Sequence, residues 1–214
     1  MITNVNAEII NSSSNKVNGK FSIGLENSHY TEKIKDVTLN NTRIPYPEDR
    51  KETVKNNTFY ISVEDSLDSD MYLGYYFSFN NSKKMGWSIL NNNLYLKYRF
   101  NSGSKFRPFF GIGGGYKSMF WDDDATANDI DFITETIGGT AATDGTGSFY
   151  ADILAGFEYQ FSKKFSLEFA ARYDITTQKY KQKGSYYNYL HKIDYNVNFE
   201  SKQLQFNLGI VYSN

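Results

Sequence analysis

Histidine is the side chain best suited to acid–base chemistry near neutral pH, and this chain of 214 residues contains two, His29 and His191. A histidine that activates a serine, or that works beside an aspartate, could support hydrolysis. Neither histidine stands in a recognisable catalytic motif: His29 falls near the end of an apparent strand, and His191 belongs to the segment Tyr189-Leu190-His191-Lys192. A solvated histidine is the simpler interpretation of both, and the sequence predicts no catalytic residue.

Carboxylates gather at Trp121-Asp122-Asp123-Asp124 and again at Asn128, Asp129 and Asp131. Oxygen ligands of this kind bind Ca²⁺, but the segment lacks the spacing, the glycine and the closing glutamate of an EF-hand loop. A solvated acidic loop is therefore the favoured interpretation. The chain contains no cysteine, which excludes disulfides and thiolate metal sites. We predict neither a metal site nor a cofactor.

The run from Lys179 to Tyr189 combines basic and aromatic side chains in the order Lys-Tyr-Lys-Gln-Lys-Gly-Ser-Tyr-Tyr-Asn-Tyr. Tyrosine is enriched at contact surfaces, so this run is a candidate binding site. Its candidate binding residues are Tyr180, Tyr186, Tyr187 and Tyr189. An alternative interpretation is a pair of protruding strands with a bend near Gly184-Ser185.

The elements that position these residues have a period of two. Between Phe149 and Ile175 every second residue is apolar, except across the join Ser162-Lys163-Lys164. This period indicates extended strands with two chemically different faces, and the join is short enough only for a hairpin. Each run is longer than the about 5–6 residues of an ordinary globular strand. Its length suits the about 9–11 residues with which a tilted strand crosses a bilayer.

The same alternation recurs along the chain and predicts eight strands. They cover 18–30, 54–65, 70–80, a segment ending at 94–100, 106–116, 149–161, 165–175 and 203–212. Short turns follow the second, fourth and sixth strands, whereas 31–53, 118–147 and 176–199 are long connections. This alternation is typical of membrane barrels with short periplasmic turns and long extracellular loops. The predicted fold is therefore all-β: an eight-stranded antiparallel up-and-down transmembrane β-barrel over 18–214, preceded by a flexible tail at 1–17.

The polar faces of these strands are predicted to point into the barrel. A soluble barrel such as a lipocalin would place its apolar face inside, but here the polar face carries glycines and charges of both signs. Small residues and opposite charges suit the narrow lumen of eight strands, where a buried charge needs a partner. The predicted interior network, with a structural role, comprises Glu26, Glu64, Lys97, Arg99, Arg107, Asp152, Glu158, Glu168, Arg172 and Asp174.

Composition agrees with strands rather than helices as the membrane-crossing elements. The mean hydropathy is −0.57, and no segment offers the about 20 consecutive apolar residues of a membrane helix. Phe, Tyr and Trp make up 17% of the chain, and its 18 tyrosines are expected in interfacial girdles and outer loops. The formal net charge of −1 argues against a nucleic-acid partner.

Three segments resemble the small outer-membrane barrels of the OmpA and opacity-protein type. Arg107–Tyr116 and Phe165–Tyr173 resemble strands of those families, and the alternating run Leu204–Tyr212 resembles the C-terminal signal read by the barrel-assembly machinery. The match departs at the end, because Ser213 and Asn214 follow the last aromatic residue. The resemblance implies the bacterial outer membrane, with a signal peptide already removed. It also implies contact with outer-membrane lipid, lipopolysaccharide and the assembly machinery.

On this reading the segments 31–53, 118–147 and 176–199 lie outside the cell. They favour a non-enzymatic surface protein whose loops bind a host surface, a glycan or lipopolysaccharide, because binding commonly resides on loops held by a rigid scaffold. The resemblance also implies an alternative, a lipid A-modifying hydrolase or surface protease with His29 or His191 at the rim. A narrow channel for small solutes is a further alternative.

Overall fold

The computed structural model describes residues 19–44, 51–82, 87–100, 103–121, 146–188 and 191–214. These residues include no helix that is long and apolar enough to cross a membrane. They form strands with the bounds β1 Lys20–Leu39, β2 Thr42–Ile44, β3 Lys51–Ser66, β4 Met71–Ser82, β5 Trp87–Arg99, β6 Phe106–Trp121, β7 Thr146–Gln160, β8 Phe165–Asp174, β9 Gln178–Asn188 and β10 His191–Ser213.

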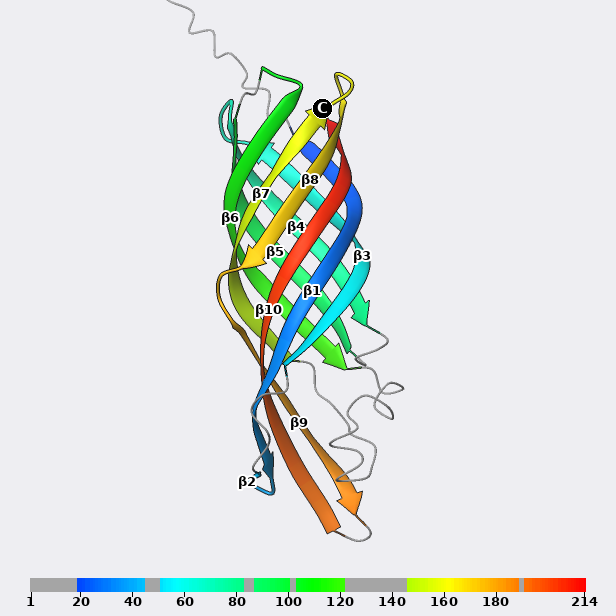
Figure 1. Ribbon diagram of the computed structural model, residues 1–214, viewed down its shortest axis with the longest axis vertical. Helices are drawn as coiled ribbons and strands as arrows, with labels where there is room; N and C mark the ends of the chain where they lie inside the picture. Colours follow the sequence, from blue (N-terminus) through cyan, green and yellow to red (C-terminus); the bar gives the residue numbers. More distant parts are fainter. Residues whose placement is uncertain (1–18, 45–50, 83–86, 101–102, 122–145, 189–190) are drawn as a thin grey trace, which may run out of the picture.

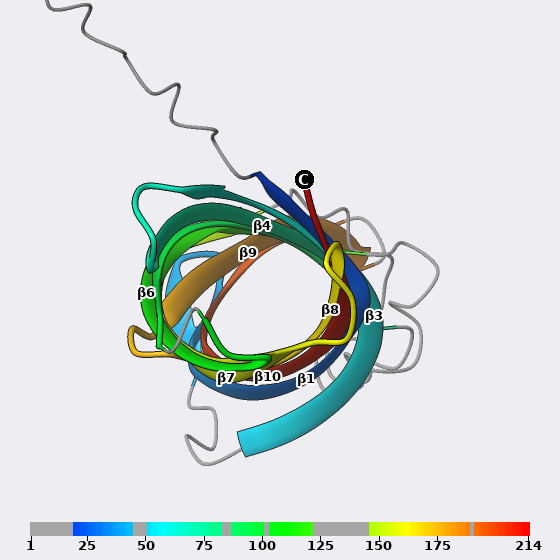
Figure 2. The same ribbon diagram turned by 90° about the horizontal axis from the view of Figure 1, so that it is seen from above.

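Eight of these strands close into an antiparallel barrel (Figures 1 and 2). Neighbours pair in the order β1, β3, β4, β5, β6, β7, β8, β10, and β10 then pairs with β1 to complete the ring. The closing ladder is long, running from Lys20 opposite Ser213 to Leu39 opposite Tyr195. β9 continues beyond β8 along the same edge of β10, and β2 adds a short strand to β1. The predicted eight-stranded antiparallel barrel is confirmed.

The apolar faces of the strands form a belt around the outside of the barrel. Side chains such as Leu25, Leu96 and Ile112 are exposed, while residues of the opposite parity, such as Glu26, Tyr95 and Lys97, are buried. Aromatic side chains border the belt at both ends, for example Phe106 near the short turns and Phe149 near the long connections. This arrangement is the inverse of a lipocalin-like barrel and requires an apolar surrounding, as in a lipid bilayer.

Short turns gather at one end of the barrel, which also holds the C-terminus (Figure 1). In the β3–β4 turn, one carboxylate oxygen of Asp68 accepts hydrogen bonds from the backbone amides of Asp70 and Met71, at 2.9 and 2.8 Å. In the β7–β8 turn, the Ser162 hydroxyl oxygen accepts the amide of Phe165 at 3.0 Å. Side chains that bond their own backbone in this way explain why these residues form tight turns.

At the opposite end the strands extend well into segments that the sequence predicts as loops. β1 runs on to Leu39 and turns through Asn40 and Asn41 into β2. Both asparagines have positive φ, 45° and 64°, as a type I′ hairpin turn requires. The segment 31–53 is therefore partly strand, and β6 and β7 likewise take the first and last residues of 118–147.

The segment 176–199, predicted as a loop, is mostly strand. β9 pairs with β10 from Gln178 opposite Ser201 to Asn188 opposite His191. The alternative with two protruding strands is the better description, but its bend near Gly184-Ser185 is wrong, because Gly184 pairs with Tyr195 within the ladder. The predicted tail at 1–17 and the carboxylates at 122–131 lie outside the described residues.

Together these extensions form a sheet, ordered β2-β1-β10-β9, that projects beyond the barrel body (Figure 1). We call residues 31–44, 178–188 and 191–201 the arm. The backbone amide of Asn40 donates to the Asp194 carbonyl at 2.8 Å, and the Asp194 amide donates to the Asn40 side chain at 2.9 Å. Arg43 and Asp36 form an ion pair at 2.8 Å. At about 3.3 Å per residue, the β9–β10 ladder is roughly 35 Å long.

Candidate functional site

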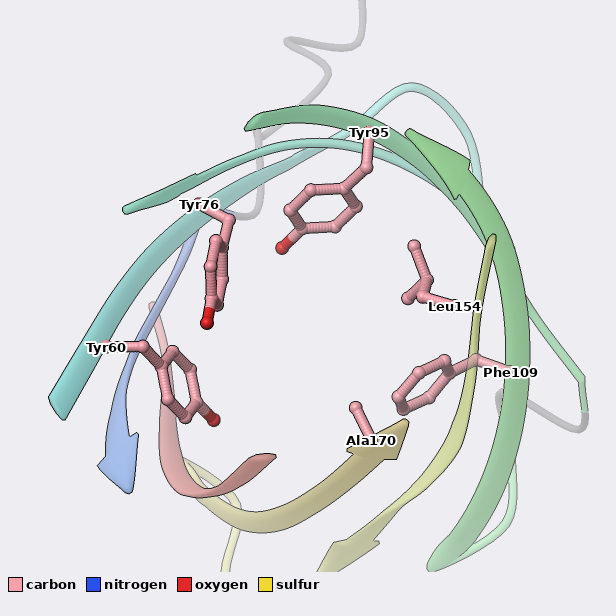
Figure 3. Packing of buried hydrophobic residues seen from close by; sticks show 6 residues of the cluster. All are labelled: Tyr60, Tyr76, Tyr95, Phe109, Leu154 and Ala170. Carbon is pink, nitrogen blue, oxygen red and sulfur yellow. The ribbon is translucent and has the colours of Figure 1, made fainter. Parts of the chain in front are cut away.

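Large side chains fill the lumen of the barrel. Tyr60, Tyr76 and Tyr95 point toward its axis together with Phe109, Leu154 and Ala170 (Figure 3). Seven buried tyrosines are found among the described residues: Tyr30, Tyr60, Tyr72, Tyr76, Tyr95, Tyr150 and Tyr180. Much of the tyrosine content therefore lies inside the barrel, rather than only in the expected girdles and loops.

Glycines provide the room that these rings occupy. Gly24 of β1 and Gly209 of β10 stand directly opposite each other at the closing seam, and a Cβ at either position would collide with the Tyr60 side chain. A Cβ at Gly74 would likewise enter the Tyr95 ring. A wall without side chains at these points lets the tyrosines lie flat across it.

Near the short turns, the Glu158 carboxylate is the centre of an ion cluster. Its oxygens lie 3.2 Å from the Lys20 ammonium, 2.7 Å from the Arg99 guanidinium and 3.5 Å from the Arg107 guanidinium. Lys20, Arg99 and Glu158 are buried, whereas Arg107 is partly exposed at the rim. The attraction of three cations offsets the free-energy cost of burying the Glu158 carboxylate.

A second cluster lies on the adjoining part of the wall. The Lys97 ammonium contacts Glu64 and lies 2.8 Å from a Glu168 oxygen, and its Nζ lies 4.6 Å from the centre of the Phe109 ring. Arg99 joins this cluster to the first, because its guanidinium is also 3.5 Å from Glu64.

Arg172 connects the aromatic cluster to a third ion pair. Its Nη1 donates to Asp152 Oδ2 and to Asn93 Oδ1, both at 3.0 Å. Its guanidinium carbon lies 4.4 Å from the Tyr76 ring centre and 4.5 Å from that of Tyr95. The guanidinium thus combines an ion pair with two cation–π contacts in a buried place.

Toward the arm, a fourth ion pair forms between Lys117 and Asp174 at 2.6 Å. The buried Glu26 carboxylate nearby accepts hydrogen bonds from neutral donors. These donors are the side chains of Ser28, Tyr76, Asn80, Gln203 and Gln205. Hydrogen bonds to uncharged donors can satisfy a buried carboxylate in place of a cation.

All ten predicted interior residues lie on the inner face of the wall, although Arg107 is at its rim. Sequence reasoning missed the buried lysines Lys20 and Lys117. Lys117 lies on the same inward face of β6 as Gly111, Gly113 and Gly115. The predicted strand ends at residue 116, one residue too early to include it. With these two lysines the described interior side chains include equal numbers of cations and anions: Lys20, Lys97, Arg99, Arg107, Lys117 and Arg172 against Glu26, Glu64, Asp152, Glu158, Glu168 and Asp174.

A lumen filled in this way is not expected to conduct ions like a porin, because open aqueous channels belong to wider barrels. In planar bilayers we expect the protein to give no stable, porin-sized conductance steps. As a positive control, the variant Tyr60→Ala/Tyr76→Ala/Tyr95→Ala should conduct measurably more, since it removes the rings that face the axis. Large steady steps from the unaltered protein would show that the interior opens.

Comparison with known proteins supports the fold. No family model and no curated protein matches the sequence. Among solved structures, the outer membrane protein OprG from Pseudomonas aeruginosa has a TM-score of 0.62 at 14% identity, covering 92% of this chain and 97% of that chain. The outer membrane protein AlkL in lipid bilayers has a TM-score of 0.54 at 12% identity, covering 100% of this chain and 97% of that chain. The fold is that of an outer-membrane β-barrel.

His29 lies on the outer wall of this barrel rather than in a catalytic cluster. Its Nε2 is 2.8 Å from the Asn27 side-chain oxygen, and its ring stands edge-on to Phe206 at 6.0 Å. Within the described contacts His29 has neither a serine nor an aspartate at hydrogen-bond distance. The side chain of His191 lies outside the described residues. The described part of the chain also contains no group of three or more His, Cys, Asp and Glu that could hold a metal ion.

The candidate binding tyrosines divide between described and undescribed positions. Tyr180 is 2% exposed and, like Gln178 two residues earlier, points inward. Its predicted place on a contact surface is therefore wrong. Tyr186 and Tyr187 belong to β9, but their side chains lie outside the described residues, as does Tyr189. Tyr186 and Tyr187 are therefore placed on the arm by strand and register alone.

Proposed function

We propose that this chain is a non-enzymatic surface protein of the bacterial outer membrane, and that its arm presents the binding surface outside the cell. The observation that carries this proposal is the arm itself. It continues the lipid-facing strands β1 and β10 far beyond the apolar belt in an almost unbroken register. The one irregularity is a bulge between Ile34 and Asp36.

Orientation follows from the two unlike ends of the barrel. Outer-membrane barrels turn briefly on the periplasmic side and carry long connections outside. The short turns of this chain therefore face the periplasm, and the arm extends from the opposite end (Figure 1). The apolar band of such barrels is about 25 Å tall. The arm begins where this band ends, so most of its roughly 35 Å lies outside the membrane.

The exposed parts of the arm are polar and fixed in place. The β1–β2 hairpin exposes Asn40, Asn41, Thr42 and Arg43, and Asp194 is exposed on β10. Backbone pairing on both sides of β10 holds these groups in a sheet, so a ligand need not order them on binding. Amide, hydroxyl and charged groups suit a hydrated ligand such as a glycan or a polar host protein.

The interior supports a non-enzymatic role. Its ionisable groups engage one another across the lumen in compensated pairs and clusters, as a filled barrel core requires. His29 is occupied by Asn27 and Phe206 on the outer wall. These described ionisable groups thus stabilise the barrel, and the proposed binding resides on the arm.

Trimming the arm tests this proposal. Gln182 pairs with Val197 and Val37 pairs with Ile44, so replacing residues 183–196 and residues 38–43, each with an Asn-Gly turn, should leave two shorter hairpins on an intact barrel. We expect the trimmed protein to remain heat-modifiable on gels. Bacteria that display it should lose at least about tenfold in adherence to host cells and immobilised glycans, as expected when a central contact region is removed.

A second deletion, of residues 122–145, serves as the comparison because it leaves every residue of the arm in place. It should retain the adherence of the full chain. If adherence survives the loss of the arm tip, or disappears only with residues 122–145, the arm is not the binding surface.

A further inference from the structure

We propose that the outer wall carries a binding site for the phosphorylated headgroup of an outer-leaflet glycolipid, on the face made by β3, β1, β10 and β9. The inference rests on the membrane orientation proposed above. It does not depend on which ligand the arm binds, and it concerns the level at which the apolar belt ends and the arm begins.

The apolar belt gives way to polar side chains on three adjacent strands, and on β10 the change falls between Leu204 and Lys202. On β1 the outward side chains change from Leu25 to His29, and on β3 they change from Phe59 to Lys55. His29 stands directly opposite Lys55 on one side and Leu204 on the other. This level is the boundary between the acyl chains and the headgroups of the outer leaflet.

Basic side chains collect at this boundary on the face made by these strands and β9. We call Lys55, His29, Lys202, Lys179 and Lys181 the basic collar. Lys55, Lys179 and Lys181 are exposed, and Lys202 lies opposite Thr31 in the closing ladder. By contrast, the described outward-facing side chains of β4, β5, β6 and β7 include no Lys or Arg.

A hollow of about 520 Å³ opens within the collar, between β1, β10 and the junction of β8 with β9. Leu204 and Tyr173 supply its apolar surface, and His29, Thr31 and Lys202 supply its polar surface. The Lys202 ammonium lies 5.9 Å from the centre of the Tyr173 ring. A lipid that inserts an acyl chain beside Leu204 would bring its headgroup to the lysine, where ammonium and phosphate attract each other.

One carboxylate, Glu200, also lines the hollow. Glu200 stands directly opposite Lys179 in the β9–β10 ladder, where opposite charges offset each other. The remaining lysines Lys55, Lys181 and Lys202 leave the collar positively charged. Charge complementarity therefore selects an anionic headgroup rather than a cation.

Native mass spectrometry of the detergent-solubilised full chain tests the site with diphosphorylated lipid A as the probe. The variant Lys55→Gln/Lys179→Gln/Lys202→Gln is compared with Lys105→Gln/Lys163→Gln/Lys164→Gln, which removes the same charge from exposed residues at the short turns. We expect the first variant to bind lipid A at least about tenfold more weakly, and the second to bind like the unaltered chain. Heat-modifiable migration identifies folded samples, and Lys202→Gln alone replaces the triple variant if that variant does not fold.

Further probes determine which part of the lipid is recognised. The unaltered chain should bind dephosphorylated lipid A weakly. Its affinity should match that of the Lys55→Gln/Lys179→Gln/Lys202→Gln variant for diphosphorylated lipid A. Equal binding of the phosphorylated and dephosphorylated forms would overturn the proposal, as would equal losses in the two lysine variants. Equal affinity for phosphatidylglycerol would show a site for any anionic lipid and overturn the glycolipid assignment. Because the assay contains no host ligand, failure here leaves the result of arm trimming unaffected.

Discussion

Arg172→Ala is expected to lower the free energy of unfolding by about 3–5 kcal/mol, because it leaves the Asp152 carboxylate buried without its cation. The same change removes a hydrogen bond to Asn93 and the cation–π contacts with Tyr76 and Tyr95. Equilibrium urea unfolding in detergent micelles or phosphatidylcholine vesicles measures the loss. The midpoint should fall while the slope with denaturant stays close to that of the unaltered protein.

A double-mutant cycle separates the ion pair from the other contacts of Arg172. Asp152→Ala should also be destabilising, since it leaves a buried guanidinium without its carboxylate. The double variant should be more stable than the sum of the two single losses implies, because neither charge is then left alone. A loss below about 1 kcal/mol in Arg172→Ala would mean that water reaches this pair and screens it.

Gly209→Ala is expected to destabilise the barrel by about 1–3 kcal/mol through overpacking at the closing seam. The new methyl group would collide with the Tyr60 hydroxyl and come within 3.0 Å of the Ile23 carbonyl oxygen. Tyr60 is 1% exposed, so its ring has little space to move into. The fraction of protein that reaches the heat-modifiable folded form, followed against urea, measures the effect.

The matched control is Gly103→Ala in a short turn, where an added Cβ meets nothing within 4 Å. This change should be nearly neutral. Adding Tyr60→Ala to Gly209→Ala should make the glycine substitution less costly than it is beside the intact ring. If the cost of Gly209→Ala is the same with and without the ring, Tyr60 is not what excludes the methyl group.

The barrel strands were predictable because lipid and lumen impose opposite chemistry on alternate residues. In the run from Phe149 to Ile175 this constraint leaves a period of two that the sequence shows directly. The arm was harder to predict because only part of it repeats this contrast. Residues 193–200 of β10 do alternate, with Ile193, Tyr195, Val197 and Phe199 between polar residues, but β9 from Gln178 to Asn188 shows no such alternation to indicate the partner strand.

The alternation along each strand likewise predicts that the interior charges point inward. It does not predict which charges form ion pairs with one another. Lys20 and Glu158 are 138 residues apart, and Lys97 and Glu168 are 71 apart. Such pairs depend on the stagger and tilt of the whole barrel, which no local pattern encodes. Tyr180 shows the same limit, since its inward place follows from the alignment of β9 with β10 and not from its Tyr- and Lys-rich neighbours.

The arm draws its strands from both ends of the chain. Residues 31–39 come from the first strand and residues 191–201 from the last, and the two segments meet only through the ladder that closes the barrel. A contact between such distant segments forms late, after the intervening strands have taken their places. The complete arm can therefore exist only on a finished barrel. A molecule that displays the complete arm on the cell surface is therefore a correctly closed barrel. A ligand that needs the whole arm would not bind molecules whose barrels had failed to close.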